Sequence, residues 1–160
     1  MVRIIIVNGN DEIIGHKKRG TLKQSDIYRV SALWIRNSNG DILLAQRKFT
    51  KKNDPGKWGP AVAGTNDEGE SYESNIIKEA EEEIGLKNCN FQKIDNIRYI
   101  GEYNYFCQWF LLTVDKELDE FIIQESEVEQ IKWFKKDELL GEFKKNPDKF
   151  LEVIQDCINF

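Results

Sequence analysis

The chain has 160 residues, of which 40% are hydrophobic and 32% charged, and its formal net charge is −5 at pH 7. This length predicts one domain, 1–160, and the acidic balance argues against duplex nucleic acid, whose binding sites are basic. The apolar runs are too short for a signal peptide or a membrane span, and the three cysteines lack paired spacing. We therefore expect a cytoplasmic protein without disulfides, structural zinc or membrane contact.

The first part of the sequence predicts five strands, because apolar segments alternate with Asn-, Gly- and Pro-rich turns. The turn at residues 8–11 joins the first two segments and indicates an N-terminal β-hairpin within 1–20. The last of the five is expected to end on Gly64. The predicted strands are Ile4–Val7, Glu12–His16, Arg29–Ile35, Asp41–Arg47 and Trp58–Ala63.

A helix is predicted from Tyr72 to Ile84, with Ser71 as its N-cap and Gly85 as its terminator. With Glu79 at zero on a wheel of about 100° per residue, Glu83 falls roughly 40° to one side and Glu82 roughly 60° to the other. A different arc is apolar, so one face is expected to pack on a sheet while another presents three carboxylates. The apolar arc consists of Ile76, Ile77, Ala80 and Ile84.

Clustered carboxylates on one helix face repel one another, unless a cation lies between them. Mg²⁺ prefers oxygen ligands, and such a cluster supplies them. The alternative interpretation is an ordinary solvated acidic face.

The rest of the chain predicts three more strands and two C-terminal helices within 137–158. Strands with interspersed helices indicate an α/β (α+β) fold, a mixed sheet that carries helices on its faces. The strands are Ile94–Tyr99, Tyr105–Val114 and Gln130–Phe134, and the helices are Asp137–Phe143 and Asp148–Ile158.

Segment 64–86 resembles the Nudix box, Gly-x5-Glu-x7-Arg-Glu-U-x-Glu-Glu-x-Gly-U, in which U is a bulky aliphatic residue. The sequence departs from this pattern at Lys78, which replaces the arginine, and at Ala80, which replaces the first aliphatic residue. The N-terminal hairpin and the segments around Arg47 and Trp58 are similar to the Nudix branch related to isopentenyl diphosphate isomerase. The matching box positions are Gly64, Glu70, Glu79, Glu82, Glu83, Gly85 and Leu86.

This resemblance implies a Nudix-like fold with a site for Mg²⁺, or alternatively Mn²⁺. It implies that Glu70 and Lys78 orient the ligands, although lysine lacks the bidentate fork of arginine. Together with Glu82 and Glu127, these two residues form the catalytic set that we expect. The implied metal ligands are Glu79, Glu82, Glu83 and the carbonyl of Ala63.

Residues outside the box are also candidates for the site. Arg47 is a candidate for binding substrate phosphate, whereas Lys48, Lys51 and Lys52 beside it are interpreted as a solubilising loop. Glu127 is chosen over its acidic neighbours as an additional carboxylate of the site. Tyr103 and Tyr105 are interpreted as strand packing, with pocket lining as the alternative.

The expected function is metal-assisted hydrolysis of a small-molecule diphosphate, such as a nucleoside diphosphate derivative. Isopentenyl diphosphate isomerisation is a rival. It is disfavoured because segment 58–65 contains no cysteine or histidine, and Tyr28 stands where relatives often have histidine. A catalytically silent binding module is the second rival. The sequence is also compatible with a homodimer.

Overall fold

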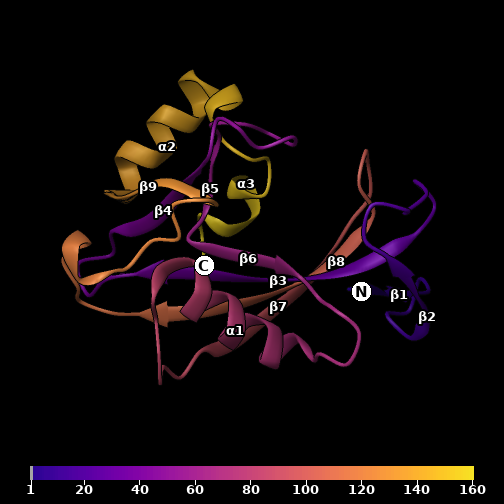
Figure 1. Cartoon of the computed structure of the whole chain (residues 1–160). Helices are drawn as coiled ribbons and strands as arrows, with labels where there is room; N and C mark the ends of the chain where they lie inside the picture. Colours follow the sequence, from indigo (N-terminus) through magenta and orange to yellow (C-terminus); the bar gives the residue numbers. More distant parts are fainter. Residues whose placement is uncertain (1) are drawn as a thin grey trace.

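The computed structural model describes residues 2–160 and contains one mixed, nine-stranded sheet with helices on both faces (Figure 1). The strand order is β2-β1-β3-β4-β5; β6 and β8 also pair with β3, β7 pairs with β8, and β9 pairs with β4. The strands are β1 Arg3–Val7, β2 Ile13–Lys18, β3 Ile27–Arg36, β4 Ile42–Arg47, β5 Trp58–Pro60, β6 Val62–Thr65, β7 Gln92–Tyr99, β8 Tyr105–Thr113 and β9 Val128–Phe134.

The helices are short compared with the strands. They are α1 Tyr72–Ile84, α2 Lys136–Lys145 and α3 Ile154–Cys157, with the 3-10 turns η1 Leu118–Glu120 and η2 Pro147–Lys149. Within residues 2–160, no helix is long and apolar enough to cross a membrane.

Strand β3 forms the centre of the sheet. It runs parallel to β8 from Tyr28 to Arg36 and antiparallel to β6 from Val30 to Leu33. Its alternate side chains enter two hydrophobic cores, one shared with α1 and the other with the C-terminal segment. Because both faces are covered, β3 is apolar at every position from residue 32 to residue 35 rather than alternating.

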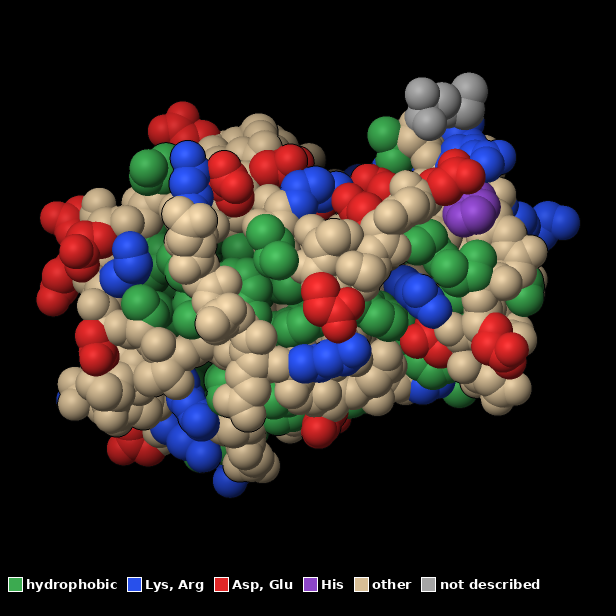
Figure 2. Space-filling model, turned by 90° about the horizontal axis from the view of Figure 1, so that it is seen from below, with side chains coloured by type: hydrophobic (Ala, Val, Ile, Leu, Met, Phe, Trp, Pro, Cys, Tyr) green, Lys and Arg blue, Asp and Glu red, His purple; other side chains and the backbone are tan. Residues whose placement is uncertain are grey.

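Helix α1 packs on one face of this sheet, while α2 and the C-terminal segment lie on the other (Figure 1). On the molecular surface seen from below, hydrophobic side chains remain visible between scattered charges (Figure 2). Acidic groups gather at the end away from the N-terminal hairpin.

Two elements that the sequence predicts as continuous are each divided into two in the structure. The strand predicted at Trp58–Ala63 is divided at Ala61 into β5, which pairs with β4, and β6, which pairs with β3 and extends to Thr65. The chain changes partner strands at this point, a change that depends on long-range pairing.

The helix predicted at Asp148–Ile158 is also broken, into η2 and α3. The backbone at Phe150 forms a parallel bridge with Trp58, and the Leu151 N–H donates to the Trp58 carbonyl at 2.9 Å. Because this contact requires extended backbone, the helix is interrupted there. The buried side chains of Phe150 and Ile154 complete the second core.

Candidate active site

Helix α1 begins and ends where its local sequence predicts. The Ser71 hydroxyl accepts from the Ser74 N–H at 3.0 Å, and the Ser74 hydroxyl accepts from the Ser71 N–H at 2.9 Å. At the other end Gly85 adopts a left-handed conformation with φ 71°. Such a reciprocal cap and glycine terminator satisfy end groups of the helix backbone. The helix therefore holds its glutamates in a fixed register.

One residue of the predicted apolar face is placed differently. Ile77 is 56% exposed, whereas Asn75 is fully buried in its stead. The Asn75 amide donates to Glu70 at 2.8 Å and to the Thr65 carbonyl at 3.2 Å. Hydrogen bonds thus allow a polar residue to occupy the buried face, and this face ties α1 to the preceding loop.

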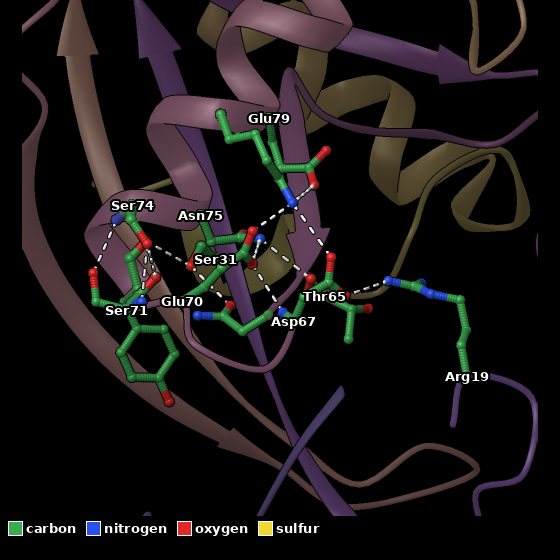
Figure 3. Close-up of polar contacts among 12 residues, drawn as sticks. Arg19, Ser31, Thr65, Asp67, Glu70, Ser71, Ser74, Asn75 and Glu79 are labelled. Carbon is green, nitrogen blue, oxygen red and sulfur yellow. Dashed lines mark hydrogen bonds and ion pairs between the residues drawn. The ribbon is translucent and has the colours of Figure 1, made fainter. Parts of the chain in front are cut away.

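Lys78 lies among three carboxylates, in the network shown in part in Figure 3. Its Nζ atom is 2.5 Å from Glu70 Oε1, 3.4 Å from Asp67 Oδ2 and 3.7 Å from Glu79 Oε1. Asp67 is also paired with Arg19 at 3.1 Å. Lys78 therefore links the loop carboxylates to Glu79, which the resemblance implies as a metal ligand.

These contacts keep Glu70 ionised. Partial burial raises the pKa of its carboxyl, but hydrogen bonds from Lys78, the Asp67 N–H and Asn75 outweigh burial and leave the pKa below its usual value. Burial is the largest single influence and lowers the pKa of Lys78, but the hydrogen bond to Glu70 and the charges of Glu70, Glu79 and Asp67 together outweigh it and raise the pKa overall. The pair is thus charged on both sides at neutral pH.

Gly64 provides the space that Glu79 occupies. A Cβ atom at Gly64 would lie 2.5 Å from Glu79 Cγ and 2.6 Å from its Cδ, a distance that side chains do not tolerate. The carboxylate side chain consequently lies directly on the backbone of β6. The glycine at the start of the box is explained by this close approach rather than by turn geometry.

Glu79 and Glu83, one helical turn apart, bring their carboxyl groups within hydrogen-bonding reach of each other. Burial, followed by the charge of Glu79, raises the pKa of Glu83 to about 9, while a backbone hydrogen bond from Ala63 opposes the rise. Burial is also the largest cause of the raised pKa of Glu79. Two carboxyl groups that share one half-buried place favour holding a proton or a cation between them.

This donor set fits a divalent cation of the Mg²⁺ class, which takes carboxylate and carbonyl oxygens. Glu79 and Glu83 meet against Gly64 and Ala63, and the charge of Glu82 acts on Glu79. Glu82 itself is exposed. No group of three acidic, histidine or cysteine side chains among residues 2–160 converges closely enough to hold a metal ion by itself. Water and substrate oxygens would complete such a shell.

Glu127 is distant from α1 in the sequence but lies near Glu83 in the structure. It lies immediately before β9, lines a small pocket with Glu83 and Ala63, and contributes to the raised pKa of Glu83. It also forms an ion pair with Lys51.

Arg47 lines this pocket too, and its Nε atom donates to the Asn53 carbonyl at 3.1 Å. Lys51 lines the pocket as well, so it is more than part of a solubilising loop. Lys48 is paired with Glu129 at 3.3 Å, and Lys52 is exposed.

The sequence interpretation missed three contributors: Asp67, Asn75 and the buried pair formed by Ser31 and Asn66. Ser31 Oγ donates to Asn66 at 3.1 Å or to the Tyr72 carbonyl at 2.9 Å and so joins β3 to the box loop and α1. Only Asp67 had a signal in the sequence, as an additional acidic residue within the box loop. The others are polar residues whose burial depends on tertiary packing.

Comparison with known proteins relates this chain to a family. The NUDIX domain model matches residues 27–154. An uncharacterised Nudix hydrolase of Listeria monocytogenes is 26% identical and covers 84% of this chain and 80% of its own length. An isopentenyl-diphosphate Delta-isomerase of Photorhabdus laumondii is 26% identical over 98% of this chain and 90% of its own length.

The fold is found again in solved structures. A crystal structure of a Deinococcus radiodurans protein superposes with a TM-score of 0.84 at 21% identity and covers 98% of this chain and 97% of that one. The likeness extends over β1 and β2, which precede the matched domain. The mixed curled sheet with its helices therefore confirms the α+β fold expected from the sequence.

Proposed function

Because the chain belongs to the Nudix domain family and is a hydrolase of pyrophosphate bonds, we propose that it is a metal-dependent enzyme acting on an organic diphosphate. The proposed metal is Mg²⁺ or Mn²⁺, and the proposed substrate is a nucleoside diphosphate derivative or a similar small molecule. The observation that carries this proposal is the meeting of the half-buried Glu79 and Glu83 against Gly64 and Ala63.

In this proposal Glu79, Glu82, Glu83 and the Ala63 carbonyl hold the cation. When bound, the cation supplies positive charge that offsets the charge of the diphosphate. Glu70 and Lys78 keep Glu79 in place through their ion pair. Arg47 lines the pocket and contacts substrate phosphate, for which its fork is suited.

Attack on phosphorus requires a water molecule that loses a proton. Glu127 is proposed to accept that proton, because it lines the same pocket as Glu83 and Ala63, where the proposed cation and its water would lie. Glu82 is the second candidate for this role, as an exposed carboxylate next to Glu79.

The chain is similar to isomerase sequences, but the positions of its cysteines and its histidine disfavour isomerisation. His16 is in β2 beside Glu68 at 3.5 Å, and Cys107 and Cys157 are buried in the second core. Neither these residues nor Cys89 line the pocket of Glu83 and Glu127. A hydrolytic reaction needs neither residue type, so hydrolysis is the better match.

The decisive experiment is a screen of a diphosphate library with Mg²⁺ for release of phosphate or monophosphate and for isomerised product. The Glu82→Gln variant should lose turnover, whereas Glu81→Gln should not, because Glu81 faces away and pairs with Lys87 at 3.6 Å. Isomerised product would replace the hydrolase proposal with the isomerase. Absence of turnover across the library, with ligand binding retained, would support a silent binding module instead.

A further inference from the structure

A second hollow lies at the N-terminal end of β3, outside the carboxylate pocket. It is about 450 Å³ in volume and is bounded by the loop 19–26 on one side and the bend 101–104 on the other. Its apolar lining consists of Ile4, Leu22, Tyr28 and Tyr103. The loop 19–26 precedes the part of the chain that matches the family domain, residues 27–154.

Tyr28 stands at the end of a stack of aromatic rings. Its ring is stacked on Tyr105 with centroids 5.4 Å apart, and Tyr105 is stacked on Tyr99 at 4.9 Å. These residues are paired across the neighbouring strands β3, β8 and β7. Tyr105 is thus strand packing as expected, but Tyr103 is 40% exposed in a bend and lines the hollow.

The walls of the hollow are tied together before any ligand enters. The Asn104 amide donates to the Gln24 carbonyl at 2.6 Å, and the Tyr28 N–H donates to the Asn104 carbonyl at 3.2 Å. Gln24 also donates to the Gly101 carbonyl at 3.5 Å. A pocket held in shape by such bonds loses little entropy when it binds a rigid ligand.

The polar groups of the hollow favour an uncharged ligand. Its charged residues are two basic and two acidic, namely Arg19, Lys23, Asp26 and Glu102. Arg19 is paired with Asp67, and Asp26 with Lys17 at 2.7 Å. Gln24, Asn53, Asn104 and Thr65 add neutral hydrogen-bonding groups to the lining. This mixture is suited to a flat ring with hydrogen-bonding edges and poorly suited to a branched hydrocarbon, which offers no hydrogen bond to the side-chain oxygens of the lining.

Two residues of the hollow are linked directly to residues of the carboxylate pocket. Thr65 lines the hollow and directly follows Gly64, on which Glu79 lies. Asn53 lines it as well, and its carbonyl accepts from Arg47, which lines the carboxylate pocket. A single ligand can therefore place its diphosphate at one site and its organic half at the other.

We infer that this hollow is the specificity subsite for the organic half of the substrate, and that it takes a planar, uncharged heterocycle that extends the tyrosine stack at Tyr28. This inference rests on the proposed function, since it places the diphosphate at the carboxylate pocket. It assigns substrate choice to Tyr28, Tyr103 and the N-terminal loop 19–26.

Equilibrium binding tests the subsite without turnover. ADP, methyl diphosphate and isopentenyl diphosphate are titrated calorimetrically into the intact protein in metal-free buffer. ADP should bind about tenfold more tightly than methyl diphosphate, the difference typical of stacking one base on aromatic side chains. Tyr103→Ala should reduce this advantage several-fold, because it removes one aromatic wall of the hollow, and leave methyl diphosphate binding unchanged. The exposed Tyr103 can be truncated without opening the core, and Tyr28→Phe should retain the advantage because it keeps the ring.

A matched control is Ile14→Ala, which removes an exposed apolar side chain, 66% accessible, from β2 without touching the hollow. Equal binding of ADP and methyl diphosphate by the wild-type protein would overturn the subsite, even if the library screen shows hydrolysis. Tighter binding of isopentenyl diphosphate, lost in Tyr103→Ala, would overturn the choice of a heterocycle. A ring preference without turnover on any diphosphate would refute the proposed hydrolysis and leave the subsite standing.

Discussion

At the scale of single residues, the site is built from carboxyl groups placed where ionisation is unfavourable. Glu83 is held half-buried beside Glu79, and its pKa is raised to about 9, mainly by burial and then by the charge of Glu79. The folded protein therefore binds a proton that the unfolded chain releases near the ordinary value of 4.5. Without metal, folding stability must fall as the pH rises through this window.

We predict that the melting temperature of the metal-free protein decreases between about pH 5 and about pH 9, and that Glu83→Gln flattens this decrease. Glutamine keeps the shape but removes the proton equilibrium, so the variant should be more stable than wild type at the alkaline end and should lose turnover. Thermal melts across this range in chelator, with Mg²⁺-dependent rates, provide the measurement. An identical pH profile for both proteins would show that Glu83 is solvated.

Lys78 allows a test of how the network positions Glu79. Lys78→Ala should reduce the rate about 10–100-fold, the range typical for residues that orient metal ligands through hydrogen bonds. Lys78→Arg should preserve or improve the rate, since a planar fork restricts the carboxylate more tightly. Rates at saturating Mg²⁺ and titrations of Mg²⁺ affinity separate the two variants. An alanine variant as fast as wild type would contradict the positioning role.

At the scale of elements, α1 depends on its caps as much as on its packing. Gly85 ends the helix in the left-handed region, and its N–H and that of Leu86 donate to the carbonyls of the last turn. A Cβ at Gly85 would lie 2.9 Å from Ile122 Cβ. Position 85 therefore requires glycine for two independent reasons, conformation and space.

Gly85→Ala should lower the free energy of unfolding by at least about 1–2 kcal/mol, the cost of a left-handed alanine. For a chain of this length, each kcal/mol corresponds to roughly 2–4 °C in melting temperature. Gly141→Ala is the matched control, because Gly141 lies inside α2 with nothing within 4 Å of its Cβ position. That variant should gain about 0.5–1 kcal/mol. Equal effects at both positions would refute the capping argument.

At the scale of the whole molecule, metal binding and folding should be coupled. The ligands proposed for the cation come from α1 and β6, and Glu127 approaches from the end of β9. These segments meet only in the folded state, so a cation that binds there stabilises the fold.

Mg²⁺ should therefore raise the melting temperature as well as support turnover. At a concentration of 100 times Kd, the gain is about 2.7 kcal/mol. Excess chelator should abolish turnover, and restored Mg²⁺ or Mn²⁺ should return it. Differential scanning calorimetry with and without Mg²⁺, with Glu81→Gln as an unaffected control, checks the prediction. Full activity in chelator would rule out metal-dependent hydrolysis.

Local interactions made the bounds of α1 predictable from the sequence. Its observed bounds, Tyr72 to Ile84, agree with the prediction because Ser71, Gly85 and the apolar spacing act within a few residues of the helix ends. The proximity of Glu79 and Glu83 follows in the same way, since residues four apart on a helix are always neighbours. The sequence by itself therefore determined the helix and the placement of its acidic face.

Only the tertiary structure decided which distant residues join that face. Glu127 reaches the carboxylate pocket because β9 pairs with β4, and the division of β5 from β6 follows from their different partner strands. The burial of Asn75 and the interruption of the C-terminal helix at Phe150 have the same origin. Such features depend on contacts between residues far apart in the chain, and the energy of those contacts outweighs local preference where the two disagree.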